Sequence, residues 1–311
     1  MLAGYDSLVS STVLCVIYLE LLMLLVTQAL TKRYGAFTAL DALDMRIDQG
    51  EVFGLLGPNG AGKSTALRLI LGFLKPTSGS SSIAGHDSWT DGVRARKKIA
   101  YLPGELRLYE NMTGRQLLDF LSGLRGRPVR TDLQKIASHF DIDIDAPLAT
   151  MSSGMKRKVA LLLVLDPYAD LIIMDEPTNT LDPTMREILL DEVREARKRG
   201  QAVFFSSHVM SEVEAVCDRV GVIRKGKLVF SEKMVALRTG RQVKIKLPSD
   251  GPVSELDGLN LVWRRERFLH LEYSGALDHL MAWIARVAPE DFSVEPMGLE
   301  GIYRKFHGEP Q

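Results

Sequence analysis

The feature that most constrains this chain is a glycine-rich segment, which lies between a short apolar run and a helical pattern. The segment reads Gly57-Pro-Asn-Gly-Ala-Gly-Lys-Ser-Thr65. The apolar run 51–56, bounded by Gly50 and Gly57, predicts a buried strand. After the segment, apolar residues recur at helical spacing and predict a helix that packs on a sheet: Leu67, Ile70, Leu71 and Leu74. This order of strand, loop and helix is typical of an α/β fold that binds phosphate.

The residue types in the loop suit the phosphates of a nucleotide. Glycines let backbone N–H groups wrap phosphate oxygens, the Lys63 ammonium reaches the β- and γ-phosphates, and the Ser64 hydroxyl ligates Mg²⁺. We therefore predict ATP and Mg²⁺ as ligands. The residues assigned to nucleotide binding in this loop are Gly57, Asn59, Gly60, Gly62, Lys63, Ser64 and Thr65.

A second apolar run, 171–174, ends in two carboxylates, Asp175 and Glu176. Residues at the carboxyl end of a buried parallel strand lie in the ligand crevice of an α/β sheet. There Asp175 can hold Mg²⁺ and Glu176 can polarise a water molecule. The competing interpretation is an acidic strand end that only faces solvent.

Two further segments extend the α/β pattern. Asp182 and Pro183 predict the start of a helix that runs to a stop at Gly200. The apolar run 202–205 then leads to His208, at the carboxyl end of another strand. From the residues alone, His208 is either a structural histidine or part of the site.

Taken in order along 24–230, these motifs resemble the nucleotide-binding subunit of an ATP-binding-cassette (ABC) transporter. The resemblance implies a P-loop NTPase-type ABC ATPase domain with a mainly parallel core sheet. It implies that Glu176 is the catalytic carboxylate, that His208 contacts the γ-phosphate and that Asp182 belongs to the D-loop. It also implies that Tyr34 stacks on adenine, although a tyrosine in the core or at a strand end is the alternative.

The segment Met151-Ser-Ser-Gly-Met155 resembles the family signature LSGGQ, with Ser152 and Gly154 kept. A small hydroxyl and backbone N–H groups at a helix N-terminus can bind an anion. In the family, this segment meets the ATP that a second subunit holds. The resemblance therefore implies a homodimer in which Ser152 and Gly154 act on the partner's nucleotide.

The chain departs from the family after the apolar run 99–102. The family usually has Gln after Pro at this point, whereas Pro103 is followed by Gly104 and Glu105. The usual Gln ligates Mg²⁺ and responds to the membrane partner. Either Glu105 substitutes for it or the two residues form only a turn.

Beyond these motifs, the chain predicts a helical insertion and a separate tail. Residues of about 105–150 form the helical subdomain, which receives the membrane subunit in the family and which has leucines on one helical face. After 233, alternating and helical patterns predict strands at 243–247 and 268–273 and helices at 277–287 and 298–306. We predict an ATPase domain over 23–233 and a small α+β accessory domain over 234–311.

The apolar run 9–26 has two interpretations. It just reaches the length of a membrane-spanning helix and contains Glu20. Alternatively, the first strand begins at Leu24 and residues 1–22 are an upstream extension; whether Met1 or Met23 is the start stays open. We favour the second interpretation.

Composition excludes several other classes. The chain has 39 Lys and Arg against 39 Asp and Glu, so it carries no net charge for a general nucleic-acid surface. Its only cysteines, Cys15 and Cys217, are too few for a disulfide framework or a zinc site and favour a reducing compartment.

The sequence therefore predicts an ATPase subunit at the cytoplasmic face of a membrane, attached through a separate permease, most consistent with export. Two alternatives remain at this stage. One is a non-transport ABC protein that acts on ribosomes or DNA, which usually has two cassettes or a long coiled coil. The other is a nucleotide-binding regulator without turnover, suggested by Gly104 and the altered signature.

Overall fold

The computed structural model describes residues 23–126, 128 and 130–307. They divide into two compact units. The first contains the described residues up to Cys217 together with Gly221–Phe230. The second contains Asp218–Val220 and the described residues from Ser231 onward.

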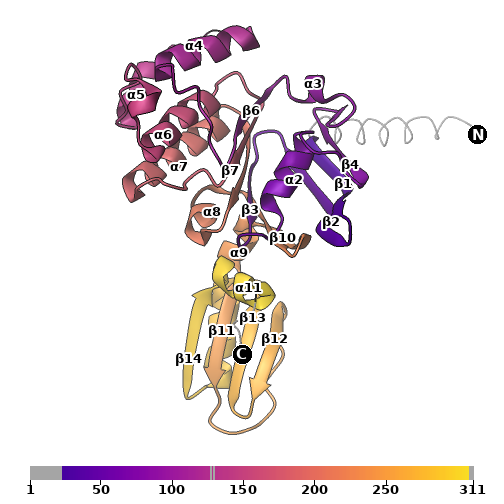
Figure 1. Cartoon of the computed structure of the whole chain (residues 1–311). Coiled ribbons are helices and arrows are strands. Elements are labelled where there is room, and N and C mark those ends of the chain that lie inside the picture. The colour runs from indigo at the N-terminus through magenta and orange to yellow at the C-terminus, as the bar shows by residue number, and fades with distance from the viewer. Residues whose placement is uncertain (1–22, 127, 129, 308–311) are drawn as a thin grey trace, which may run out of the picture. The chain divides into compact units, whose positions relative to one another are not determined.

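An antiparallel sheet opens the first unit (Figure 1). Its strands are β1 (Met23–Tyr34), β2 (Phe37–Asp48), β4 (Ser78–Ile83) and β5 (His86–Asp87), in the order β2-β1-β4-β5. The predicted first strand at Leu24 is confirmed as part of β1. The sequence interpretation missed the other three strands, because β2 is interrupted by polar residues and β4 contains a run of serines.

The central sheet has six strands in the order β10-β9-β3-β8-β7-β6. Strand β3 pairs with β8, β8 with β7 and β7 with β6, and all three pairings are parallel. Every residue of β3, β7 and β8 is buried, which explains why these strands read as unbroken apolar runs. The bounds are β3 (Val52–Leu56), β6 (Ile99–Leu102), β7 (Leu171–Asp175), β8 (Ala202–Ser207), β9 (Arg219–Arg224) and β10 (Lys227–Lys233).

Helix α2 (Lys63–Ile70) packs between the two sheets. One apolar core joins its Leu67 and Ile70 to side chains of β1 and β2 and to alternate residues of β3, β7 and β8. The helix is shorter than predicted: Leu71 is its C-cap and Leu74 lies beyond it. Gly72 follows with a positive φ of 66°, which ends the helix.

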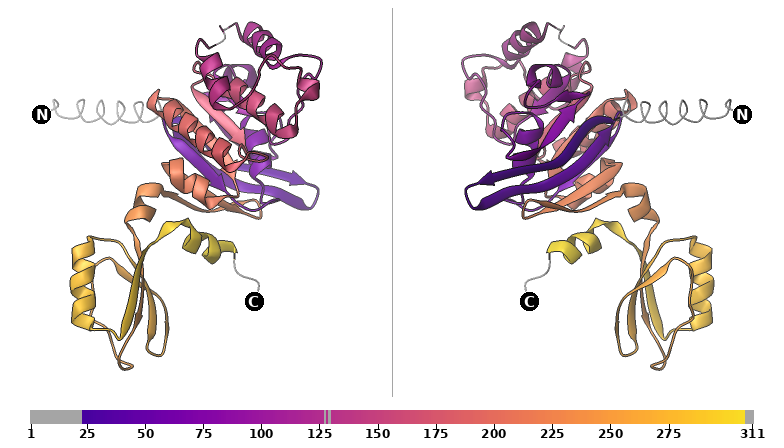
Figure 2. Two further views of the ribbon diagram at one scale, coloured as in Figure 1. Left: turned by 90° about the vertical axis from the view of Figure 1, so that its left-hand side faces the viewer. Right: turned by 90° about the vertical axis from the view of Figure 1, so that its right-hand side faces the viewer.

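Helices α6 (Ser153–Val164), α7 (Pro183–Lys198) and α8 (Met210–Val216) lie on the side of the central sheet away from α2 (Figures 1 and 2). The predicted start of α7 is confirmed, because Asp182 caps it by accepting a hydrogen bond from the Met185 N–H at 3.0 Å. Helix α3 (Gly92–Ala95) precedes β6.

The predicted helical insertion contains α4 (Gly114–Arg125), α5 (Leu133–His139) and a short 3-10 turn at Leu148–Thr150. Thr113 and Gln116 form a capping box at the start of α4. Leu117 and Leu118 are buried, but Leu124 is exposed, so the apolar face covers only the first part of this helix.

The second unit is an α+β fold. Its antiparallel sheet has the order β12-β13-β11-β14, with β11 (Arg241–Lys246), β12 (Leu259–Arg265), β13 (Phe268–Tyr273) and β14 (Asp291–Pro296). Helix α10 (Leu277–Val287) covers one face through Trp283, which is fully buried. Helices α9 (Met234–Thr239) and α11 (Gly298–His307) complete the unit. The predicted strands and helices are present; β12, β14 and α9 were not predicted.

In the described part of the chain, no helix combines the length and the apolar character needed to cross a membrane. Most of the apolar run 9–26 lies outside the described residues, and its last four residues begin β1.

Candidate functional site

The glycine-rich loop follows the carboxyl end of β3 in the central sheet and leads into α2. The Gly57 N–H donates a hydrogen bond to the Ser207 carbonyl at 3.2 Å, which fastens the loop to β8. Gly62 has a φ of 111°, and a Cβ there would lie 2.8 Å from the Ala39 carbonyl oxygen. This position therefore requires glycine. Gly62 is also the N-cap of α2. Because it has no side chain to accept hydrogen bonds from the first N–H groups of the helix, these groups can bind an anion.

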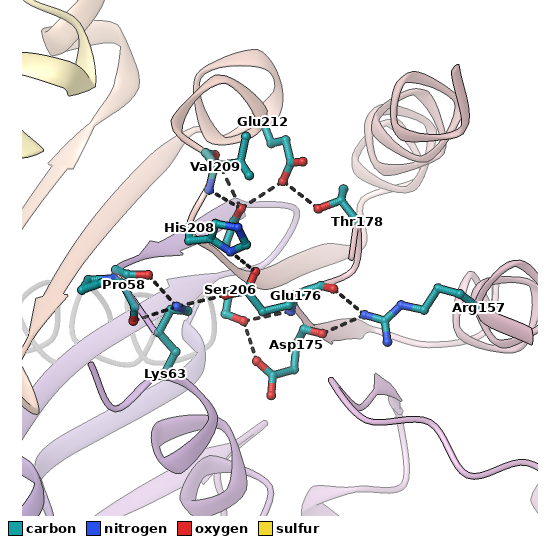
Figure 3. A network of polar contacts seen from close by, with 12 residues as sticks. Pro58, Lys63, Arg157, Asp175, Glu176, Thr178, Ser206, His208, Val209 and Glu212 are labelled. Atoms are coloured by element: carbon teal, nitrogen blue, oxygen red, sulfur yellow. Dashed lines mark hydrogen bonds and ion pairs between the residues drawn. The ribbon is translucent and has the colours of Figure 1, made fainter. Parts of the chain in front are cut away.

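Lys63 points back over this loop (Figure 3). Its side chain is 5% exposed. The ammonium Nζ donates to the Gly57 and Pro58 carbonyls at 2.5 and 3.2 Å and forms an ion pair with Glu176 Oε1 at 2.9 Å. The loop from β3 and the residue that follows β7 are thus joined by one buried cation.

Glu176 is the centre of the site. It follows β7 with a φ of 48°, a left-handed conformation that is uncommon for a residue other than glycine. Its Oε2 lies 2.8 Å from His208 Nδ1, while Oε1 contacts Lys63. The structure therefore brings together three residues that the sequence placed at the ends of three separate elements (Figure 3).

Asp175 lies on the opposite side of the Glu176 backbone. Its Oδ1 accepts a hydrogen bond from Ser206 Oγ at 2.6 Å, and Ser206 Oγ accepts one from the Glu176 N–H at 3.0 Å. Burial, followed by the charge of Asp175, raises the pKa of Tyr101 to about 12. The carboxylate of Asp175 and the hydroxyl of Ser64 are the oxygen donors that Mg²⁺ prefers, so this donor set fits that ion.

A cleft of about 200 Å³ lies over the loop. It contains most of the residues predicted to bind nucleotide; its full lining is Phe37, Ala39, Pro58, Asn59, Gly60, Gly62, Lys63, Ser64, Thr65 and Glu176. Tyr34 is not part of the lining and is 52% exposed. Phe37, its partner across the β1–β2 turn, lines the cleft instead. The sequence interpretation missed Phe37, although an aromatic so close to Tyr34 was a usable signal.

The signature segment and the D-loop residue lie apart from this cleft. Ser152 caps α6, accepting a hydrogen bond from the Met155 N–H at 3.2 Å. A Cβ on Gly154 would lie 3.2 Å from the Thr180 carbonyl oxygen, so this segment packs closely on the loop after β7. Ser152, Gly154 and Asp182 do not line the cleft.

Gly104 lies against Asp175. A Cβ at this position would be 3.2 Å from Asp175 Oδ2, tighter than ordinary contact. Glu105 is exposed, so its side chain is not enclosed in the site.

Arg157, on α6, was not predicted. Its side chain reaches the Asp175 and Glu176 carbonyls at 2.9 and 2.5 Å (Figure 3). Burial lowers the pKa of Arg157 to about 10, so its guanidinium is still charged at neutral pH. The only signal for Arg157 in the sequence was its position shortly after the signature segment.

Glu212, on α8, was also missed. It is 4% exposed, and its Oε2 accepts hydrogen bonds from Thr178 Oγ1 at 3.0 Å and Ser207 Oγ at 2.9 Å. These hydroxyls flank Glu176 and His208 in sequence, so Glu212 joins the two segments that position them.

Comparisons with known proteins show the family of this chain. The family model described as "ABC transporter" matches residues 40–179. The Bacillus subtilis protein YhaQ, an uncharacterized ABC transporter ATP-binding protein, is 32% identical over 285 residues, covering 89% of this chain and 91% of YhaQ. The chain belongs to the ABC transporter ATP-binding proteins. The sequence prediction of this family is confirmed.

Two other relatives of this ABC protein match a smaller share of it. YbhF of Escherichia coli, named a probable multidrug ABC transporter ATP-binding protein, is 37% identical over 207 residues. These residues are 65% of this chain and only 36% of YbhF, so the chain spans about a third of that relative. Nod factor export ATP-binding protein I of Ralstonia nicotianae is 34% identical over 217 residues, 68% of this chain and 67% of that protein.

A solved structure of the ATP-binding subunit of an ABC transporter superposes on this ABC protein with a TM-score of 0.64 at 28% identity. It covers 69% of this chain and 92% of that chain. The predicted P-loop ABC ATPase fold is confirmed.

Proposed function

We propose that this chain is the ATP-hydrolysing subunit of an ABC transporter, and that it powers export through a separate membrane permease. The observation that carries the proposal is the meeting of Lys63, Glu176 and His208 beside the phosphate-binding loop. A buried ammonium, a carboxylate and an imidazole at one point supply charge stabilisation and proton transfer for phosphoryl transfer to water.

Each residue of the site has a role in this proposal. Lys63 and the N–H groups from Gly60 to Thr65 hold the β- and γ-phosphates of ATP. Ser64 and Asp175 would hold Mg²⁺, which neutralises charge on the phosphates when it is bound. Phe37 or Tyr34, on the turn beside the loop, stacks on the adenine base.

Glu176 orients and deprotonates the attacking water, and His208 stabilises charge at the γ-phosphate. The contact between Glu176 and His208 at 2.8 Å holds the two side chains in a fixed relation. Binding of the phosphates by Lys63 competes with its ion pair to Glu176. This competition releases the carboxylate for the water, so the residues that pair before binding separate in the working site.

The site is completed by a second copy of the chain. Ser152, Gly154 and Asp182 lie outside the cleft of their own chain, which suits residues that act on a neighbour's nucleotide. The exposed hydroxyl of Ser152 at a helix N-terminus provides an anion site for that nucleotide. We therefore propose a head-to-tail homodimer with two ATP molecules between the copies.

The transport role rests on the relatives. Their names include a multidrug transporter component and a Nod factor export protein, which favours export for this chain. In this proposal residues 23–233 form the ATPase domain, the subdomain of about 105–150 receives the permease and 234–311 form an accessory domain. The chain is then held at the cytoplasmic face of the membrane by its permease.

The test is Mg-ATP hydrolysis by the purified chain beside a Glu176→Gln variant. The proposal expects turnover in the wild type, at least about 100-fold lower turnover in the variant and an ATP-dependent dimer of the variant. Glu195→Gln, on the surface of α7, is the control and should hydrolyse ATP as the wild type does. ATP binding without turnover, also in membranes that contain the permease, would favour the regulator instead.

A further inference from the structure

We infer that Arg157 is a positioning residue that fastens the helix of the signature segment to the backbone that carries Glu176. The inference rests on the proposed function, because it concerns how the hydrolysis site is assembled. The hydrogen bonds of Arg157 go to backbone carbonyls and not to the side chains that line the cleft. Arg157 therefore acts on the site through the backbone.

All five N–H groups of the guanidinium are used. Nη2 donates to the Asp175 and Glu176 carbonyls at 2.9 and 2.5 Å, and Nε donates to the Pro177 carbonyl at 3.2 Å. Nη1 donates to the Pro103 and Gly104 carbonyls at 2.9 and 3.1 Å. Three separate segments therefore meet at one side chain: α6, the end of β6 and the end of β7.

This arrangement needs arginine. The side chain is 3% exposed, and every hydrogen bond it makes here goes to a carbonyl. The planar fork of a guanidinium can serve five acceptors in fixed directions, whereas a lysine ammonium has only three donors. Lysine at this position would keep the charge, but at least two of these carbonyls would lose their hydrogen bond from this side chain.

The bonds fix the part of the backbone that sets the direction of the Glu176 carboxylate. Asp175, Glu176 and Pro177 are consecutive, and their three carbonyls all accept from the same group. Glu176 has the positive φ of 48°, a conformation that persists only where its surroundings hold it. We therefore expect the carboxylate to lose its alignment with Lys63 and His208 when Arg157 is replaced.

The same hydrogen bonds couple the signature segment to the hydrolysis site of its own chain. Ser152 and Arg157 belong to one helix start, so a shift of α6 when Ser152 meets the partner's nucleotide would pull on the Glu176 carbonyl. The segment after β6 is attached to the same guanidinium through Pro103 and Gly104. Arg157 would thus link both segments to the position of the catalytic carboxylate.

The test compares the full-length wild type with Arg157→Lys and Arg157→Met. Lys158→Gln is the matched control, because it removes a cation from the next position of α6. The Lys158 ammonium makes only a long contact, at 3.5 Å, with the Asp141 carbonyl. For Arg157→Lys we expect kcat to fall about 100-fold, as for an error of about 1 Å in alignment, with the Kd for ATP within threefold of the wild type. The control should stay within twofold in both.

Amide hydrogen exchange of the nucleotide-free proteins provides a second readout that needs no turnover. In both Arg157 variants, the amides of Glu176 and of residues 178–180 should exchange at least tenfold faster, while those of β3 stay unchanged. Should Arg157→Met fail to fold, Arg157→Lys still decides the question.

The inference is overturned if Arg157→Lys keeps kcat within threefold of the wild type, or if exchange over 176–180 is unchanged. An equal loss of kcat in Lys158→Gln would also overturn the inference, since the loss would then come from removing a positive charge from α6 and not from the hydrogen bonds of Arg157. Absence of hydrolysis in the wild type would count against the proposed function instead, and the exchange result would still judge the role of Arg157.

Discussion

Lys63 and Glu176 form a buried ion pair, with Nζ 2.9 Å from Oε1, between the loop after β3 and the end of β7. Removal of one partner of a buried pair leaves the other charge uncompensated, whereas removal of both is better tolerated. We predict that Lys63→Met destabilises the nucleotide-free protein by about 2–4 kcal/mol and that adding Glu176→Gln recovers part of this loss. Urea unfolding of the two single variants and the double variant measures the coupling.

The pair Lys198–Glu195 provides the control for this cycle, because its atoms are 2.8 Å apart but both side chains are largely exposed. Solvent screens such a pair, so we expect no measurable coupling there. If the effects of the Lys63 and Glu176 substitutions on the free energy of unfolding were also additive, the ion pair would contribute nothing to stability before nucleotide binds.

Gly104 provides a test of the Mg²⁺ site. Its missing Cβ would lie 3.2 Å from Asp175 Oδ2, so Gly104→Ala must displace that oxygen by a few tenths of an ångström. We predict that the Mg²⁺ concentration for half-maximal hydrolysis rises about three- to tenfold, since ligand geometry around Mg²⁺ is strict. A magnesium titration at saturating ATP measures it.

The matched variant is Gly123→Ala in α4, where an added Cβ meets nothing within 4 Å. Alanine in an exposed helix interior should stabilise the protein by about 0.5–1 kcal/mol and leave the Mg²⁺ requirement alone. An unchanged Mg²⁺ requirement in Gly104→Ala would mean that Oδ2 takes no part in holding the ion.

The sequence predicted the motif-bearing strands β3, β7 and β8 because they are buried on both faces and read as continuous apolar runs. It did not predict β2, in which buried residues alternate with exposed polar ones, or β4, which contains a run of serines and pairs with the sequence-distant β1. Lys63, Glu176 and His208 could be proposed as site residues because each lies in a predicted loop or close behind a predicted strand.

Arg157 and Glu212 could not be found in that way. Their importance comes from the groups they reach, such as the Glu176 carbonyl and the hydroxyl of Thr178, which lie 19 and 34 residues away along the chain. Sequence shows that a charged side chain is present on a helix, but only the packing of that helix shows that the charge is buried. The same limit applies to Phe37, which becomes a lining residue through the fold of the hairpin.

Glu212 should be sensitive to substitution although it lies outside the cleft. Its Oε2 accepts from both Thr178 and Ser207, and both hydroxyls lose a buried acceptor in Glu212→Ala. We predict a loss of about 1–3 kcal/mol in the free energy of unfolding, together with a lower kcat because the segments around Glu176 and His208 loosen. Glu212→Gln keeps one acceptor oxygen and should lie between the wild type and Glu212→Ala.

Urea unfolding and steady-state hydrolysis measure these effects, with the exposed Ser211→Ala on the same helix as the control. If Glu212→Ala were as stable and as active as Ser211→Ala, the two hydroxyl contacts would have no role in positioning the site.

Tyr101 reports on the charge of Asp175. Burial, and then the Asp175 carboxylate, raises the pKa of Tyr101 to about 12, whereas an ordinary tyrosine titrates near 10. Because the pKa of the folded state is the higher one, the stability that comes from the neutral phenol is complete below pH 10. That stability is lost as the pH rises from 10 to 12.

The measurement is the 295 nm absorbance after a rapid pH jump, taken before unfolding, as the difference between the wild type and Tyr101→Phe. We predict a midpoint near pH 12 for Tyr101 and a lower one in Asp175→Asn, because the second cause of the shift is then absent. A midpoint near 10 in the wild type would contradict the buried position of Tyr101 beside the carboxylate.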